Sequence, residues 1–152
     1  MNILLTGGLG YIGSHVAVTL LNAGYEVFIV DNLINSDIET LEKIEKITNR
    51  KVYFNEIDIR NTEGLNKIFD SNNLDAVIHL SGLKAVGESV LLPLEYYSSN
   101  VSGSINLFKV MQAHNVKKIV FSSSATVYGN PQYLPIDEDH PIDAINPYGS
   151  TK

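Results

Sequence analysis

The sequence predicts an α/β fold in which a doubly wound parallel sheet lies between two layers of helices. Short apolar runs rich in β-branched residues alternate along the chain with longer segments of helical spacing. The runs are apolar at consecutive positions, which is typical of strands that are buried on both faces. Right-handed crossovers then place all the strand carboxyl ends at one edge of the sheet, where folds of this kind bind their ligands.

The strands are assigned to the apolar runs and the helices to the periodic segments between them. We expect buried strands at Ile3–Thr6, Val27–Val30, Val52–Ile57, Ala76–Leu80 and Ile119–Phe121. We expect helices at Tyr11–Ala23, Asp37–Thr48, Thr62–Ser71 and Leu94–His114. Gly24 follows the first helix, at a position where glycine is favoured because it adopts a left-handed conformation. The second helix carries Ile38, Leu41, Ile44 and Ile47 on one face, which suits packing on a sheet.

Helical periodicity ends after the fifth strand, in a segment that contains four of the five prolines. Asn146 and Pro147 then form the cap and first position of a new helix. Only five residues of that helix follow the cap region, fewer than an isolated helix needs for stability. We therefore expect residues 1–152 to be the amino-terminal domain of a longer protein, and the geometry of the last helix to lack support.

Composition narrows the class of partner. The net charge of −6 gives no general attraction to nucleic acid or to anionic membranes. The chain has no cysteine and its four histidines are far apart in sequence, so we expect no metal site. No apolar run reaches the ~18–20 residues of a membrane span. We expect neither a nucleic-acid nor a membrane partner, and the cytoplasm is the simplest compartment.

The turn after the first strand has the glycine spacing of a dinucleotide site. Gly7, Gly10 and Gly13 lie in the stretch LLTGGLGYIGSH, between a strand and a helix. Glycines there let a pyrophosphate approach the backbone at the positive end of the helix. The alternative is a turn that is tightly packed for structural reasons alone. Asp31 ends the second strand, where a carboxylate binds ribose hydroxyls and repels a 2′-phosphate, so NAD is favoured over NADP; alternatively, Asp31 only caps the following loop.

Polar residues follow the other strands as well. Asp58 comes after the third strand and could accept from an adenine amino group or simply cap a turn. Lys84 follows the fourth strand, in HLSGLKAVGES, and either binds a phosphate or is solvated. The fifth strand ends in FSSSATVYG, whose hydroxyls could bind a substrate alcohol or only form a turn. The chain lacks a GxSxG elbow and a histidine–aspartate pair beside these serines, so we reject a serine hydrolase.

Tyr148 and Lys152 are four residues apart, a spacing that places two side chains on one face of a helix. A tyrosine that acts as a base near neutral pH needs its pKa lowered by roughly 3 units, or about 4 kcal/mol. One cation at ~4 Å supplies about that much at an effective dielectric constant near 20. The pair can therefore form a general base for the oxidation of an alcohol.

Taken together, Asp31 and the segments TGGLGYIG, GLKAVGES, SSSATVYG and YGSTK resemble the extended short-chain dehydrogenase/reductase superfamily and, within it, the nucleotide-sugar epimerase branch. The resemblance covers the whole chain. It implies a Rossmann-type NAD(P)-binding domain at 1–152 without its substrate domain, a bound NAD, and a homodimeric parent enzyme. The implied reaction interconverts UDP-glucose and UDP-galactose, by oxidation at C4, rotation of the 4-keto sugar and reduction on its other face.

The resemblance also implies roles for individual residues. Tyr148 takes the proton of the sugar 4-hydroxyl, Ser124 hydrogen-bonds the 4-oxygen, and Lys152 lowers the tyrosine pKa and binds the nicotinamide ribose. Ser99 stands where the family often has an asparagine, before Asn100. Besides the glycines, Asp31, Asp58, Lys84 and the Tyr148–Lys152 pair, the implied cofactor contacts are Tyr11, Ile12, Asn32, Leu33, Ile34, Asn35, Ser36, Ile59, Leu80, Ser81, Gly82, Leu83 and Ser99.

Two other functions remain open. A nucleotide-sugar 4,6-dehydratase needs an acid and a base to eliminate water, and enzymes of this type carry a Thr-Asp-Glu run after the fifth strand. This chain has Ser124, Ala125 and Thr126 there. A non-catalytic NAD-binding module is expected to have lost Tyr148 or Lys152, and both are present. The chain by itself could also bind NAD weakly and catalyse nothing.

Overall fold

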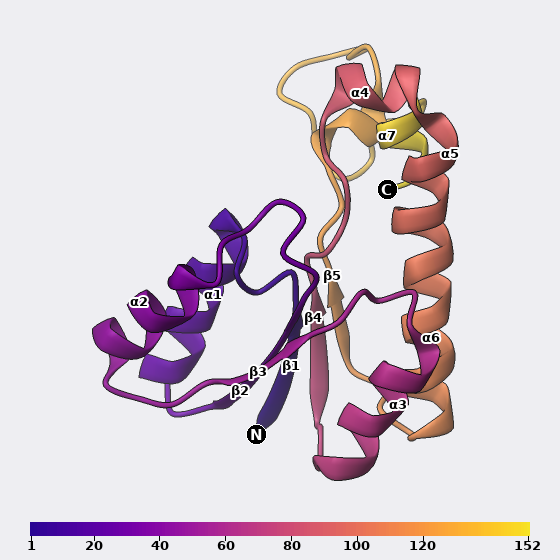
Figure 1. Ribbon diagram of the computed structural model, residues 1–152. Helices are drawn as coiled ribbons and strands as arrows, with labels where there is room; N and C mark the ends of the chain where they lie inside the picture. Colours follow the sequence, from indigo (N-terminus) through magenta and orange to yellow (C-terminus); the bar gives the residue numbers. More distant parts are fainter.

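The computed structural model describes all 152 residues and contains one five-stranded parallel sheet (Figure 1). The strands are β1 (Asn2–Thr6), β2 (Glu26–Asp31), β3 (Tyr53–Glu56), β4 (Ala76–His79) and β5 (Ile119–Phe121), in the spatial order β3-β2-β1-β4-β5. This order winds outward in both directions from β1, so the predicted doubly wound fold class is confirmed. None of the helices is both long and apolar enough to cross a membrane.

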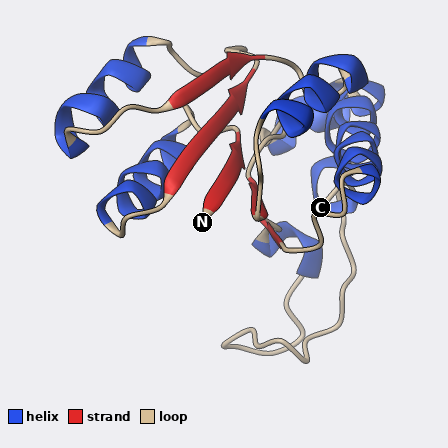
Figure 2. Ribbon diagram, turned by 90° about the horizontal axis from the view of Figure 1, so that it is seen from below, coloured by secondary structure: helices blue, strands red, loops and turns tan.

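Two helical layers cover the sheet, one on each face (Figures 1 and 2). Helices α1 (Tyr11–Asn22) and α2 (Glu39–Thr48) pack on one face, where Ala17, Leu21 and Ile44 meet buried residues of β1 and β2. Helices α3 (Thr62–Ser71) and α6 (Gly103–Ala113) pack on the other, where Leu65 and Leu107 belong to a second buried cluster. The three central strands therefore have apolar side chains on both faces, as their unbroken apolar runs predict.

The prediction that all five strands are buried is wrong for the two at the sheet edges. In β3, Tyr53 is 53% exposed, and in β5, Val120 is 62% exposed. An edge strand has a neighbouring strand on one side only, so fewer side chains pack around it. An apolar run in the sequence is the same for an edge and a central strand, so the pattern alone does not separate them.

The single helix predicted at Leu94–His114 is wrong as well. The chain instead forms α4 (Val86–Leu91), α5 (Pro93–Tyr96), a π-helical turn η1 (Tyr97–Ser102) and then α6. Pro93 occupies the first position of α5, where its missing N–H costs no hydrogen bond. The π turn shifts the register of the segment and faces the buried Asn100 toward the loop after β4.

Two short elements complete the chain. A 3₁₀ turn, η2 (Ala125–Tyr128), follows β5 inside the segment that periodicity leaves as loop. A long loop (orange to yellow in Figure 1) then leads to α7 (Pro147–Ser150), which begins at the predicted residue. Contacts of α7 with η2, α4 and α5 hold this single turn against the rest of the molecule.

Candidate functional site

A cleft runs along the carboxyl ends of the strands and is lined by nearly all the residues predicted to contact a cofactor. Among the residues up to position 100 that were predicted to contact the cofactor, only Leu33 does not line the cleft. Sequence reasoning missed Ile57, Arg60 and Glu95, which also line it. Ser122 lines it as well, and its hydroxyl is one of those at the end of the fifth strand that were expected to bind a substrate alcohol or form a turn. The predicted residues in its wall are Gly7, Gly10, Tyr11, Ile12, Gly13, Asp31, Asn32, Ile34, Asn35, Ser36, Asp58, Ile59, Leu80, Ser81, Gly82, Leu83, Lys84 and Ser99.

The glycine turn between β1 and α1 has no room for side chains. Gly7 has φ +70°, and a Cβ on Gly13 would lie 2.1 Å from the carbonyl oxygen of Gly7. The first N–H groups of the 12-residue helix α1 have no intrahelical acceptor, and no acidic residue occupies its first turn. Bare backbone donors at a positive helix end, with glycines on both sides, fit the pyrophosphate of a dinucleotide.

Asp31 ties the glycine turn to the loop that follows β2. One of its carboxylate oxygens accepts from the backbone N–H of Leu9 at 3.0 Å. The other accepts from the N–H of Leu33 at 3.0 Å and from the hydroxyl of Ser36 at 2.7 Å. The loop-capping role is therefore present. One of about four acceptor positions stays free on the oxygen that binds Leu9, so a ribose contact is also compatible with this geometry and stays a prediction.

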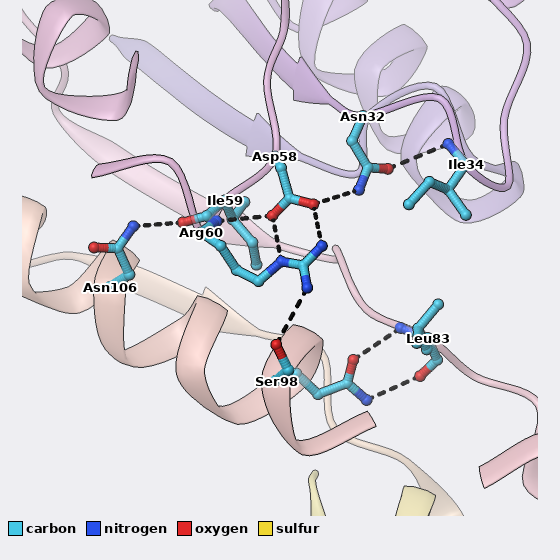
Figure 3. A network of polar contacts seen from close by, with 9 residues as sticks. Asn32, Ile34, Asp58, Ile59, Arg60, Leu83, Ser98 and Asn106 are labelled. Atoms are coloured by element: carbon cyan, nitrogen blue, oxygen red, sulfur yellow. Dashed lines mark hydrogen bonds and ion pairs between the residues drawn. The ribbon is translucent and has the colours of Figure 1, made fainter. Parts of the chain in front are cut away.

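Asp58 has all its acceptor positions filled by the chain itself (Figure 3). One oxygen accepts from the backbone N–H and the Nε of Arg60, both at 2.9 Å. The other accepts from Arg60 Nη2 at 2.8 Å and from Asn32 Nδ2 at 3.0 Å. The Arg60 side chain is the main cause that lowers the pKa of Asp58 to about 2. A contact with an adenine amino group remains a prediction that requires one of these donors to share its oxygen.

Asn100 fixes the loop after β4 through its side-chain amide. Its Oδ1 accepts from the N–H of Leu83 at 2.8 Å, and its Nδ2 donates to the carbonyl of Leu83 at 2.9 Å. The same Nδ2 donates to Thr151 Oγ1 at 3.0 Å, in the segment after α7. Asn100 thus links the cleft wall to the end of the chain. In the sequence, Asn100 falls within a segment whose apolar residues have helical spacing. A polar residue at such a position is the signal that could have indicated a buried amide.

His79 lies under this loop, 1% exposed, in a chain of hydrogen bonds. Its Nε2 lies 2.8 Å from Ser104 Oγ, whose own proton goes to the carbonyl of Asn100, so Nε2 donates to Ser104. Its Nδ1 then accepts the hydroxyl proton of Thr6 at 2.6 Å. Burial lowers the pKa of His79 to about 4, with the charge of Lys152 as a second cause. The ring is therefore neutral at physiological pH.

The three predicted catalytic residues, Ser124, Tyr148 and Lys152, are not among the residues that line the cleft, and Lys152 contacts its wall at the end of β5. Lys152 Nζ donates at 3.2 Å to the carbonyl of Ser122, which lines the cleft, and burial lowers the pKa of Lys152. Ser124 Oγ accepts from the N–H of Thr126 at 3.3 Å and from its hydroxyl at 2.9 Å. The hydroxyl proton of Ser124 is then available to another acceptor.

Tyr148 lies on α7, which several contacts hold in place. Asn146 caps the helix by accepting from the N–H of Gly149 at 2.8 Å. The ring of Tyr148 meets the buried ring of Tyr96 edge to face, with centroids 6.4 Å apart. Thr151 Oγ1 donates to the carbonyl of Tyr148 at 2.7 Å. The expectation that this turn lacks support is therefore not met within the chain itself.

The parallel doubly wound sheet, the glycine turn and the cleft at the strand carboxyl ends define a Rossmann-type α/β protein. Residues 4–152 match the family described as GDP-mannose 4,6 dehydratase. The chain belongs to this family.

Within that family, curated relatives and solved structures resemble the chain closely. It is 53% identical to UDP-glucose 4-epimerase of Dictyostelium discoideum and 54% identical to that of Bacillus subtilis, over 99% and 100% of its own length and 44% and 45% of theirs. UDP-glucose 4-epimerase of Bifidobacterium longum, solved with NAD+ and UDP, superposes with a TM-score of 0.99 at 50% identity, over 100% of this chain and 46% of that one. The chain thus spans under half the length of the relatives it matches.

Proposed function

We propose that this chain is the NAD-binding domain of a longer enzyme that interconverts UDP-glucose and UDP-galactose. The observation that carries the proposal is the juxtaposition at the β5 end of the cleft. Lys152 attaches there to Ser122, a residue of the cleft wall, and Ser124 follows two residues later with its hydroxyl proton free. A donor hydroxyl and a tyrosine–lysine pair beside a dinucleotide cleft are the groups that a reversible alcohol oxidation needs.

The comparisons support NAD as the cofactor and a UDP-sugar as the substrate. The Bifidobacterium longum epimerase was solved with NAD+ and UDP, and the epimerase of Stenotrophomonas maltophilia with NAD and formylated UDP-arabinopyranose. The second structure matches this chain with a TM-score of 0.98 at 48% identity, over 100% of this chain and 45% of that one. The glycine turn of this chain, with its bare backbone donors, fits the same kind of ligand.

Bound NAD supplies reversible acceptance of the C4 hydride, and this chain's own residues handle the proton. Tyr148 takes the proton of the sugar 4-hydroxyl and returns it when the sugar is reduced. Ser124 donates a hydrogen bond to the 4-oxygen, because both of its lone pairs face donors of Thr126. Lys152 supplies a positive charge at this end of the cleft. Its attachment to the Ser122 carbonyl sets where that charge lies.

A 4,6-dehydratase is the second candidate, because the family description names that activity. Elimination of water needs acid and base groups beside the C5–C6 bond. The positions after Ser124 hold Ala125 and Thr126, and Thr126 directs its hydroxyl to Ser124. The local chemistry therefore favours epimerisation, which needs no such carboxylates.

Incubation of the full-length protein with UDP-galactose and NAD tests the proposal. We expect UDP-glucose to form, and Tyr148→Phe to lower kcat by roughly 10²–10⁴-fold, because the phenol supplies the general base. A 4-keto-6-deoxy product would identify a dehydratase instead. Stoichiometric NAD binding without any turnover of UDP-sugars would leave a non-catalytic module.

A homodimeric assembly and a cytoplasmic location belong to the same proposal. The first is tested by sedimentation of the full-length protein. The second is tested by fractionation of the cells that produce it. A monomer would leave the chemistry intact, since every residue proposed to act on the sugar lies in this one chain.

A further inference from the structure

Two residues with positive side chains line the cleft, and they lie on opposite sides of β1. Lys84 follows β4, whereas Arg60 follows β3. Strand β3 pairs with β2, and the N–H of Ile57 donates to the carbonyl of Asp31 at 3.0 Å. Arg60 therefore belongs to the same half of the cleft as Asp31, the half predicted to bind the adenosine ribose.

The guanidinium of Arg60 is held by Asp58 (Figure 3). Its Nε and Nη2 donate to the two carboxylate oxygens at 2.9 and 2.8 Å, the bidentate geometry in which arginine binds carboxylates most firmly. Its Nη1 donates to Ser98 Oγ at 3.2 Å, so the side chain reaches from the end of β3 to η1. Asn32, the residue after Asp31, donates to Asp58 as well.

Carboxylates therefore outnumber cations in this half of the cleft. Asp31 and Asp58 line it, with Arg60 as the cation among them, and Glu95 of α5 lies close enough to help raise the pKa of Arg60. In dinucleotide sites that accept NADP, an arginine near the ribose binds the 2′-phosphate, while a carboxylate there repels it. Here the arginine is present but is already paired with a carboxylate.

We propose that Asp58 is a second determinant of selectivity for NAD over NADP, because it binds Arg60 and keeps that guanidinium from a 2′-phosphate. The inference rests on the proposed NAD site. It assigns Asp58 a role that differs from a contact with adenine, since adenine is common to both dinucleotides. It also means that replacing Asp31 alone leaves two carboxylates and a neutralised arginine, which is a poor 2′-phosphate site.

Binding of NAD and NADP to the chain, measured by titration calorimetry, tests the inference through the ratio of the two Kd values. Asp58→Asn removes one negative charge and weakens the hold on Arg60, so we expect the ratio to move toward NADP by about tenfold. Any loss of an adenine contact affects both ligands and cancels in the ratio. Adding Arg60→Leu to this variant should return the ratio to within about twofold of the unchanged chain, because the released guanidinium is then absent.

Two further variants complete the design. Glu63→Gln neutralises a carboxylate that pairs with Lys67 at 2.8 Å on the exposed face of α3, outside the cleft lining, and should leave the ratio unchanged. Arg60→Gln leaves Asp58 charged and unpaired, so the ratio should move further toward NAD. This variant keeps the test decisive even if Asp58→Asn fails to fold.

The outcomes separate this inference from the proposed function. An unchanged ratio in Asp58→Asn, or a shift that persists after Arg60→Leu, overturns the role of the pair. Binding of neither dinucleotide to the unchanged chain overturns the cofactor site and this inference with it. Normal NAD binding without epimerisation by the full-length protein contradicts the proposed reaction alone.

Discussion

Acidification should destabilise the chain through His79, and the variant His79→Gln should remove most of that dependence. The folded state lowers the pKa of His79 from its ordinary 6.5 to about 4, mainly because the ring is buried. The folded protein therefore prefers the neutral ring, and the resulting stability is complete above pH 6.5. It is lost as the pH falls from 6.5 toward 4, because the unfolded chain then binds a proton that the folded chain does not.

The magnitude follows from the two pKa values. Their separation corresponds to about 3 kcal/mol in total, and about 2 kcal/mol of this is lost between pH 7.5 and pH 5. Asp58 does not contribute in this window. Its folded pKa of about 2 lies below its ordinary 3.8, so its stabilisation is present above pH 3.8 and is lost only below it.

Urea unfolding at pH 7.5 and pH 5 measures the effect. At pH 7.5 the glutamine variant should be the less stable protein, because a glutamine does not reproduce both bonds of the ring, to Thr6 and to Ser104. The free-energy difference between the two proteins should shrink by about 2 kcal/mol at pH 5. His15→Gln, a change at an exposed ring, is the matched control and should keep the dependence. Parallel pH profiles for the unchanged chain and the His79 variant would refute the reasoning.

Two further predictions concern the walls of the cleft. Gly13→Ala should abolish NAD binding or folding, because its Cβ would lie 2.1 Å from the backbone oxygen of Gly7, whereas Gly87→Ala, whose Cβ meets nothing within 4 Å, should leave both unchanged in calorimetry and thermal melts. Asn100→Ala should lower the free energy of unfolding by about 2–4 kcal/mol and weaken NAD binding, because it leaves the N–H and C=O of Leu83 unpaired. Retention of wild-type NAD affinity by this variant would show that the loop needs no such support.

The fold followed from the sequence because its decisive signals are local. Five apolar runs alternate with helical periodicities, and the crossover rule leaves few arrangements for them. The two errors come from information that lies elsewhere in the chain. Val120 is exposed because no strand flanks β5 on its outer side, which the residues of β5 do not encode. The π turn at Tyr97–Ser102 interrupts a segment whose apolar spacing is helical on either side.

The cleft residues could be placed from the sequence because each follows a strand, and parallel strands end at one edge. What those residues bind within the chain could not be placed. The sequence left Asp31 and Asp58 each as a ligand contact or a cap, and it did not name the donors from neighbouring turns that both carboxylates accept from. Arg60 was missed because an arginine two residues after an aspartate has no distinctive pattern. Its role depends on the conformation of the turn and on Ser98, 38 residues further along the chain.

The last turn of the chain shows most directly why residue spacing alone does not predict how side chains are oriented. A single turn such as α7 is unstable alone, so the orientation of Tyr148 must come from contacts outside the turn. Four such contacts exist. The ring of Tyr148 meets that of Tyr96, Asn100 donates to Thr151, and Lys152 donates to Ser122. Gly149 also packs so closely on the backbone of Thr126 that a Cβ would lie 2.6 Å from its carbonyl oxygen. The spacing of Tyr148 and Lys152 thus singles out the pair that we propose to act, and residues 23 to 52 positions earlier in the chain hold this pair in place.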